Sequence, residues 1–246
     1  MIQTRQTRQT RQNEQGNVLF LILIAVALFA ALSYAVTQST RSGGGSAEKE
    51  TAILNSASMT QYPTSIRTSL VRMILAGTGV DNLAFNPPSN FVGGNANLVF
   101  HPDGGGAVFQ SAATDLMASG NQGTWTFNAN FNVPEIGIST AGAGNDVIAF
   151  LRGVTTSVCT RANTELGVTT TNCALNAGVP TLLAASTAAE IDILMDNLYD
   201  FDAQTTDAEV IQGNDSVGTC RAFTGQPSGC FYDGTDNVFY SVLLER

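Results

Sequence analysis

The chain has 246 residues, a formal net charge of −9 at pH 7 and only 13% charged residues. Its acidic balance disfavours nucleic acid as a partner, because phosphate binding requires clustered Lys and Arg. The low charge and the abundance of Gly, Asn, Thr and Ser are typical of an exported domain rich in strands and turns.

Residues 1–16 form a basic leader in which the triplet Thr-Arg-Gln occurs three times. Arg5, Arg8 and Arg11 outweigh the single acid, Glu14. Positive charge is retained on the cytoplasmic side of a membrane, so we expect the amino terminus to stay inside.

Residues 18–36 contain no charged side chain, and only Ser33 and Tyr34 in this run are polar. A helix of this length spans roughly 28 Å, close to the hydrocarbon thickness of a bilayer. The sequence therefore predicts one transmembrane helix over residues 17–36, in contact with lipid, and a carboxyl-terminal part that lies outside the cytoplasm.

Residues 37–46 are rich in Gly and Ser, and three consecutive glycines at 43–45 predict a flexible linker that breaks the helix. An exported globular domain is expected over residues 47–246. It begins with two predicted helical pieces, 47–61 and 63–76, which Pro63 separates and which Gly77 and Gly79 end.

The middle and the end of the chain predict mostly β structure. The best strand covers residues 124–133, where Trp125, Phe127, Ala129, Phe131 and Val133 alternate with polar residues and predict one buried face. Two helices are also expected, one from Thr155 or Thr156 to Leu166 with Gly167 as its stop, and one that a capping box opens at Thr187. Further strands are predicted at 97–100, 107–109, 147–151, 219–223, 230–233 and 238–244, the last of them central in the sheet.

The four cysteines, Cys159, Cys173, Cys220 and Cys230, all lie in the part of the chain expected to be exported. An even number of cysteines outside the cytoplasm predicts two disulfides, whereas zinc would favour closer pairs. Three pairings are possible. Proximity in the sequence favours Cys159–Cys173 and Cys220–Cys230.

The order of features at the amino terminus is a short basic leader, then Glu14-Gln15-Gly16, then an uninterrupted apolar run from Asn17. This order resembles the amino terminus of type IV prepilins and type II secretion pseudopilins. The resemblance covers about 35 residues and its motif is permissive. It implies cleavage between Gly16 and Asn17 by a prepilin peptidase, a bacterial inner-membrane anchor with a periplasmic or extracellular domain, and helix packing with other pilin-like subunits through residues 17–36.

The sequence departs from the family pattern at two positions and in the glycines at 43–45, which are expected to break what is usually one long helix in the family. Leu21 occupies the place where most pilins carry a glutamate, five residues after the cut, and Asn17 stands where Phe or Met usually begins the mature chain. Two alternatives therefore stay open. One is an uncut anchor, and the other is a signal peptide with Ser33-Tyr34-Ala35 before release at Val36.

Few residues predict chemistry. His101 is the only histidine and lies in a predicted turn, which disfavours a Ser–His–Asp triad and excludes paired-imidazole metal sites within one chain. The acidic run 200–209 suggests a weak calcium site at Asp200, Asp202 and Asp207, although the central glycine of an EF-hand loop is missing. Asp192 and Asp196 show no setting that would separate their pKa values as in a glycosidase.

We therefore expect an α+β protein: an amino-terminal transmembrane helix, then helices packed on an antiparallel sheet, pilin-like and closed by disulfides. The expected function is structural, a non-enzymatic pilin-like or pseudopilin-like subunit of an envelope filament or secretion machine. No cofactor is expected apart from the calcium hypothesis, and no small-molecule substrate is identified. The alternative is a single-span, membrane-anchored periplasmic binding or interaction domain with no filament role.

Overall fold

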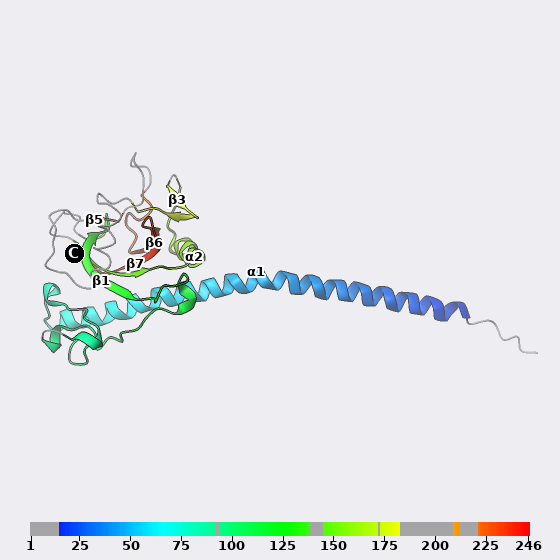
Figure 1. Ribbon diagram of the computed structural model, residues 1–246, viewed down its shortest axis with the longest axis horizontal. Coiled ribbons are helices and arrows are strands. Elements are labelled where there is room, and N and C mark those ends of the chain that lie inside the picture. The colour runs from blue at the N-terminus through cyan, green and yellow to red at the C-terminus, as the bar shows by residue number, and fades with distance from the viewer. Residues whose placement is uncertain (1–14, 92–93, 138–144, 172, 183–208, 212–220) are drawn as a thin grey trace, which may run out of the picture. The chain divides into compact units, whose positions relative to one another are not determined.

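A computed structural model of the chain describes residues 15–91, 94–137, 145–171, 173–182, 209–211 and 221–246. The chain divides into two compact units, Met1–Glu50 and Thr51–Arg246. The first unit contains the amino-terminal part of helix α1, and the second contains the rest of α1, a mixed sheet and helix α2 (Figure 1).

Helix α1 runs without interruption over Gln15–Leu75, a length of 61 residues. The predicted break at residues 37–46 is therefore wrong. Glycine lowers helix stability by only about 1 kcal/mol per residue relative to alanine, and helix-forming segments on both sides can extend through three glycines. The three glycines lower the helix propensity of this segment but do not prevent it from being helical.

The helix also continues through Pro63, so the two predicted pieces 47–61 and 63–76 are one element. Met59, Ile66 and Leu70 are buried on either side of the proline and belong to the same core cluster, which keeps both turns against one surface. The helix ends as predicted: Gly77 has a φ of 103°, and Thr78 N–H donates to Met73 O at 3.0 Å.

The main sheet has five strands in the order β5-β1-β2-β7-β6. All neighbours pair antiparallel except β5, which pairs parallel to β1. The predicted central position of the last strand is confirmed, because β7 lies between β2 and β6. The strands are β1 Trp125–Asn132, β2 Asp146–Arg152, β5 Glu209–Val210, β6 Ser228–Tyr232 and β7 Asn237–Leu244.

An irregularity in β1 changes which face its later residues meet. Asn128 pairs with Ile148 and Phe131 pairs with Asp146, so β1 contains one residue more than β2 in this interval. Such a bulge moves the following side chains to the opposite face of the sheet. Phe131 accordingly joins a different core cluster from Phe127, and the prediction of one apolar face along 124–133 is wrong beyond the bulge.

Both faces of the sheet are covered. One face carries Phe127 and Ala149 and packs against Tyr62, Ile66 and Leu70 of α1. The other face forms a second cluster, whose members include Phe131, Phe150, Phe223, Phe231 and Tyr240. The expected half-buried strand is thus buried on both sides, and Asn128, Asn130 and Asn132 are buried with it.

Helix α2, Thr156–Leu166, has the predicted bounds, with Gly167 in the left-handed conformation after it (φ 73°). Its Asn163 pairs with both backbone groups of Cys230 in β6. Asn163 Nδ2 donates to Cys230 O at 2.8 Å, and Asn163 Oδ1 accepts from Cys230 N–H at 2.8 Å.

A disulfide joins Cys159 of α2 to Cys230 of β6, with the two Cα atoms 5.4 Å apart. The pairing favoured by sequence proximity is therefore wrong for both of these cysteines. The reason is that α2 packs against β6, which lies 71 residues further along the chain at the cysteine positions. Cys173 is disulfide-bonded as well, and Cys220 lies outside the described residues.

The segment between α1 and β1 contains short 3₁₀ turns instead of strands. The predicted strands 97–100 and 107–109 are wrong: within these described residues only Leu98 forms an isolated bridge, to Ala84. Residues 221–223, at the end of another predicted strand, lie in a turn region. The 3₁₀ turns are Val80–Asn82, Pro88–Asn90, Asn95–Asn97 and Thr114–Leu116, and a small hairpin joins β3 Leu175–Asn176 to β4 Val179–Pro180.

Candidate functional site

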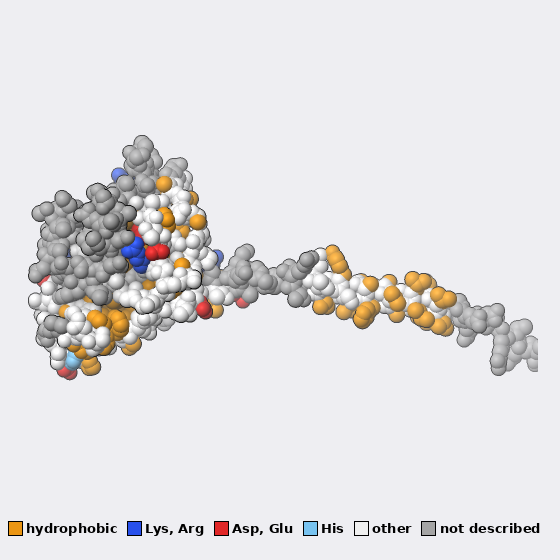
Figure 2. All heavy atoms as spheres, in the orientation of Figure 1, with side chains coloured by type: hydrophobic (Ala, Val, Ile, Leu, Met, Phe, Trp, Pro, Cys, Tyr) orange, Lys and Arg blue, Asp and Glu red, His pale blue; other side chains and the backbone are white. Residues whose placement is uncertain are grey.

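Large apolar side chains are exposed along residues 18–36 of α1, and Figure 2 shows many of them on the face in view. Over Val18–Gln38 the helix has the length and composition of a membrane span, and equally those of a signal sequence, and none of it is buried. Leaving about a dozen large apolar side chains in water would cost on the order of 20–40 kcal/mol. An apolar surface of this size favours an apolar environment, such as lipid or another protein surface, over water.

The carboxyl-terminal end of this apolar segment carries polar groups that satisfy one another along the helix. Gln38 Nε2 donates to the Tyr34 hydroxyl at 2.8 Å, and Thr37 Oγ1 donates to Ser33 O at 2.7 Å. A tyrosine with a polar tip at one end of an apolar helix is typical of a membrane–water interface.

The residues at the predicted cleavage site lie at the start of the same helix. Gly16 and Asn17 have helical backbone in the uncut chain and directly follow the first helical residue, Gln15. Leu21 is exposed and apolar like its neighbours. Residues 1–14, including the three leader arginines, lie outside the described part of the chain.

His101 makes structural contacts in a turn. Its Nδ1 accepts a hydrogen bond from Asp103 N–H at 3.1 Å, and its ring packs edge-on against Phe91 at 4.9 Å between centroids. Within the described ranges, no serine hydroxyl is recorded against this histidine, so the residues present here do not form a nucleophilic triad.

The calcium hypothesis falls on residues that the structure does not describe. Asp200, Asp202 and Asp207 lie within the range 183–208, as do Asp192, Asp196 and the helix predicted from Thr187. Among the described residues, no group of three or more His, Cys, Asp or Glu side chains is placed to hold a metal ion.

Asp146 is a buried carboxyl group that sequence reasoning missed. Its Oδ2 accepts from Val133 N–H at 2.9 Å, and its Oδ1 accepts from Arg246 N–H at 3.3 Å. Burial is the main reason that the pKa of Asp146 rises to about 6, with a smaller contribution from the charge of Glu245. The position of this carboxyl, between the β1 bulge and the chain end, gives it a structural role.

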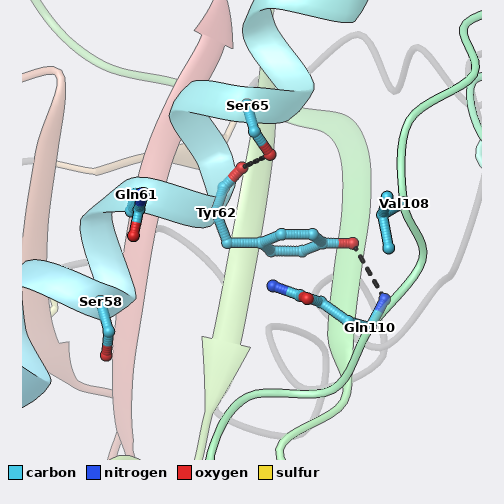
Figure 3. Close-up of a pocket in the computed structure, with 6 residues that line it drawn as sticks. All are labelled: Ser58, Gln61, Tyr62, Ser65, Val108 and Gln110. Carbon is cyan, nitrogen blue, oxygen red and sulfur yellow. Dashed lines mark hydrogen bonds between the residues drawn. The ribbon is translucent and has the colours of Figure 1, made fainter.

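A groove lies between α1 and the segment that precedes β1. We call it the α1 groove, and its volume is about 410 Å³ (Figure 3). Its lining residues are Ser58, Gln61, Tyr62, Ser65, Val108 and Gln110. The Tyr62 ring packs 5.2 Å from Trp125 between centroids, while its hydroxyl points toward Gln110 and accepts from Gln110 N–H at 3.4 Å.

Sequence reasoning did not identify the α1 groove. Ser58, Gln61 and Ser65 share one flank of a helix and look like an ordinary solvated surface. The opposite wall comes from residues 107–110, whose path depends on the bonds of Ala107 N–H to Val99 O and of Ala112 N–H to Gly123 O. No motif in the sequence marks that path.

Comparison with known proteins adds no assignment. No protein-family model, curated protein or solved structure matches this chain.

Proposed function

We propose that the chain is a non-enzymatic, membrane-anchored subunit of an envelope filament or secretion machine, similar to type IV pilins and type II secretion pseudopilins. One observation carries the proposal: α1 exposes apolar side chains all round in its first unit, and buries an apolar face against a mainly antiparallel sheet in its second. The resemblance implies one long helix whose first part anchors the subunit and whose second part packs against the sheet. The continuity of α1 through residues 43–45 therefore supports the proposal.

The proposed mechanism is an exchange of partners along residues 17–36. In the bilayer, lipid chains cover the apolar side chains, and in an assembly the helices of neighbouring subunits would take the place of lipid. Because both environments are apolar, the exchange rests on close packing of side chains and on lipid entropy, and not on the hydrophobic effect itself. Leu21 offers no carboxylate to pair with a neighbour's amino terminus, so this mechanism assigns the association to apolar packing.

The test is the intact mass and amino-terminal sequence of the protein isolated from its native membrane fraction. The proposal predicts a chain that starts at Asn17. In a Gly16→Ala variant we expect the leader to remain attached, whereas a matched Gly45→Ala variant should be processed normally. A start at Val36 would identify a released protein and contradict the proposal, and normal processing of Gly16→Ala would contradict prepilin-type cleavage.

A second function, a membrane-anchored interaction domain with no filament role, is favoured by Leu21, since the usual glutamate is absent. The two functions differ in what they require of residues 18–36. Replacement of this segment by an unrelated apolar span should abolish a filament or secretion function while the protein stays in the membrane fraction. If function survives the replacement, the segment acts only as an anchor, and the interaction domain is the better assignment.

A further inference from the structure

The α1 groove lies wholly within the second unit and does not depend on the proposed membrane role. Its volume of about 410 Å³ falls within the range of small-molecule sites. Six residues from two separate segments converge on it, so its shape is set by tertiary structure and not by one exposed helix flank.

The polar groups in the α1 groove retain hydrogen-bonding capacity. Ser58 Oγ donates to Asn55 O and Ser65 Oγ donates to Tyr62 O, which leaves both hydroxyl oxygens as acceptors. Tyr62 Oη accepts from Gln110 N–H and keeps its own proton to donate. Within the described residues, no hydrogen bond is recorded for the side-chain amides of Gln61 and Gln110, and each can both donate and accept.

The lining carries no charge. Burial raises the pKa of Tyr62 to about 12, so its phenol is neutral at every physiological pH, and the other five lining residues do not ionise. A charged ligand entering the groove would lose hydration without gaining an opposite charge in the lining. This composition disfavours phosphate, carboxylate and metal ligands and favours a neutral one.

Apolar surface accompanies the polar groups. Val108 is 70% exposed on one wall, and the Tyr62 ring is held in place by its contact with Trp125. A fitting ligand therefore combines hydroxyl groups, which both donate and accept hydrogen bonds, with an apolar C–H face. Saccharide rings have this combination.

We propose that the α1 groove binds a neutral saccharide of one or two rings. The side-chain amides of Gln61 and Gln110 hydrogen-bond its hydroxyl groups from opposite walls, Tyr62 Oη donates to one of its oxygens, and Val108 contacts its C–H face. The other occupant that such a lining admits, an uncharged extended peptide, is distinguished by the test.

The test uses the full chain in lipid nanodiscs, without glycoside detergents, because their head groups are themselves saccharides. Saturation-transfer NMR is recorded with cellobiose, maltose and N,N′-diacetylchitobiose, and with an uncharged Ser-Gly peptide for comparison. We expect saturable transfer to at least one disaccharide and not to the peptide. Gln61→Ala and Gln110→Ala should each weaken binding about three- to tenfold, as the loss of one net hydrogen bond predicts.

Two further variants sharpen the result. Tyr62→Phe keeps the ring against Trp125 and removes the donor, so it should weaken binding by a similar factor, and Gln122→Ala, outside the groove lining, should leave binding unchanged.

Three results would overturn the proposal: no transfer to any disaccharide at about 10 mM, well above a millimolar Kd; unchanged affinity in a Gln61→Ala/Gln110→Ala double variant; or preferential binding of the peptide. The two glutamines are exposed, so this double variant remains informative even if Tyr62→Phe fails to fold.

Discussion

Ala177 adopts a left-handed backbone conformation, with a φ of 50°, in the two-residue turn between β3 and β4. Gly178 follows it with a φ of 90°. Tight hairpin turns that require positive φ at both positions favour Asn-Gly or Gly-Gly, because a Cβ atom in this region is strained. Gly178 suits the positive φ of the second turn position, whereas Ala177 carries a Cβ atom that is strained at the first.

We therefore expect Ala177→Asn to stabilise the protein by about 0.5–1 kcal/mol. The measurement is the free energy of unfolding in urea. Ala174→Gly is the matched control, because Ala174 has no positive φ and added backbone freedom there should lower stability. Equal shifts in the two variants would mean that conformational strain at residue 177 has no measurable effect.

Asp146 makes the free energy of unfolding decrease as the pH rises, which is opposite to the usual effect of a carboxyl group. Its pKa is about 6 in the folded chain against 3.8 for an unperturbed Asp, so the folded state binds its proton more tightly than the unfolded state does. The resulting stabilisation is fully present below about pH 4 and is lost as the pH rises through about 6. Asp146→Asn removes this dependence, because the amide stays neutral.

The expected outcome is that the unfolding free energy of Asp146→Asn rises relative to the wild type as the pH increases from 4 to 7. Urea unfolding at several pH values in this window provides the measurement. Asp115→Asn makes the same chemical change at an exposed position and serves as the control. A constant difference between Asp146→Asn and the wild type would show that residue 146 does not titrate in this window.

The Cys159–Cys230 bond, which joins helix α2 to strand β6, can be checked by trypsin digestion, because the cut sites place these two cysteines in different peptides. Cleavage after Arg152, Arg161 and Arg221 places Cys159 in peptide 153–161, both Cys173 and Cys220 in peptide 162–221, and Cys230 after residue 221. The structure predicts that peptide 153–161 is bonded directly to the carboxyl-terminal peptide.

The pairing expected from proximity would instead link all three peptides in series, with 162–221 in the middle. Mass spectrometry of a non-reduced digest distinguishes the two arrangements. Loss of the observed bond in a Cys159→Ala/Cys230→Ala variant should lower stability by roughly 4 kcal/mol, as expected for a closed loop of about 70 residues. A matched digest of that variant should contain no linked 153–161 peptide.

Sequence patterns predicted the elements whose signals are local. The stop signal Gly167 after α2, the apolar run at 18–36, the alternating residues of β1 and the short apolar runs of β6 and β7 identified real helices and strands. Features that depend on distant partners were missed: the bulge that redirects Phe131, the covering of the second sheet face, and the contact of α2 with β6 that determines the partner of Cys159. The α1 groove was missed for the same reason, since its two walls are more than 40 residues apart in the chain.

At the scale of the whole molecule, the second unit contains its own core. Met59, Ile66 and Leu70 belong to its α1 surface, and the sheet, α2 and the segment between α1 and β1, with Phe85 and Phe100, also contribute to this core. A fragment covering residues 51–246 should therefore fold and stay monomeric without detergent, whereas a fragment that begins at residue 77 loses the helix that covers one sheet face.

Circular dichroism and size-exclusion chromatography of the two fragments provide the test. Cooperative thermal unfolding is expected for 51–246, and aggregation is expected for 77–246, which would expose Phe127 and Trp125. Aggregation of the longer fragment would mean that the core described for residues 51–246 is not self-sufficient and needs residues 1–50.

The pairing of Asn163 with the backbone of Cys230 also affects how copies of this chain can associate. A strand at the border of a sheet ordinarily recruits strands from other molecules through its unpaired amide and carbonyl groups. On β6, the amide side chain of Asn163 already occupies both groups of Cys230, and Leu182 N–H occupies Tyr232 O. On the opposite border, β5 has only two residues. Pairing with a strand of another molecule is therefore blocked along β6. If this chain forms a polymer, we expect contacts between apolar helices to hold it together. Detergent, which competes for such helices, should then dissolve the polymer under conditions in which denaturants that disrupt β-sheets do not.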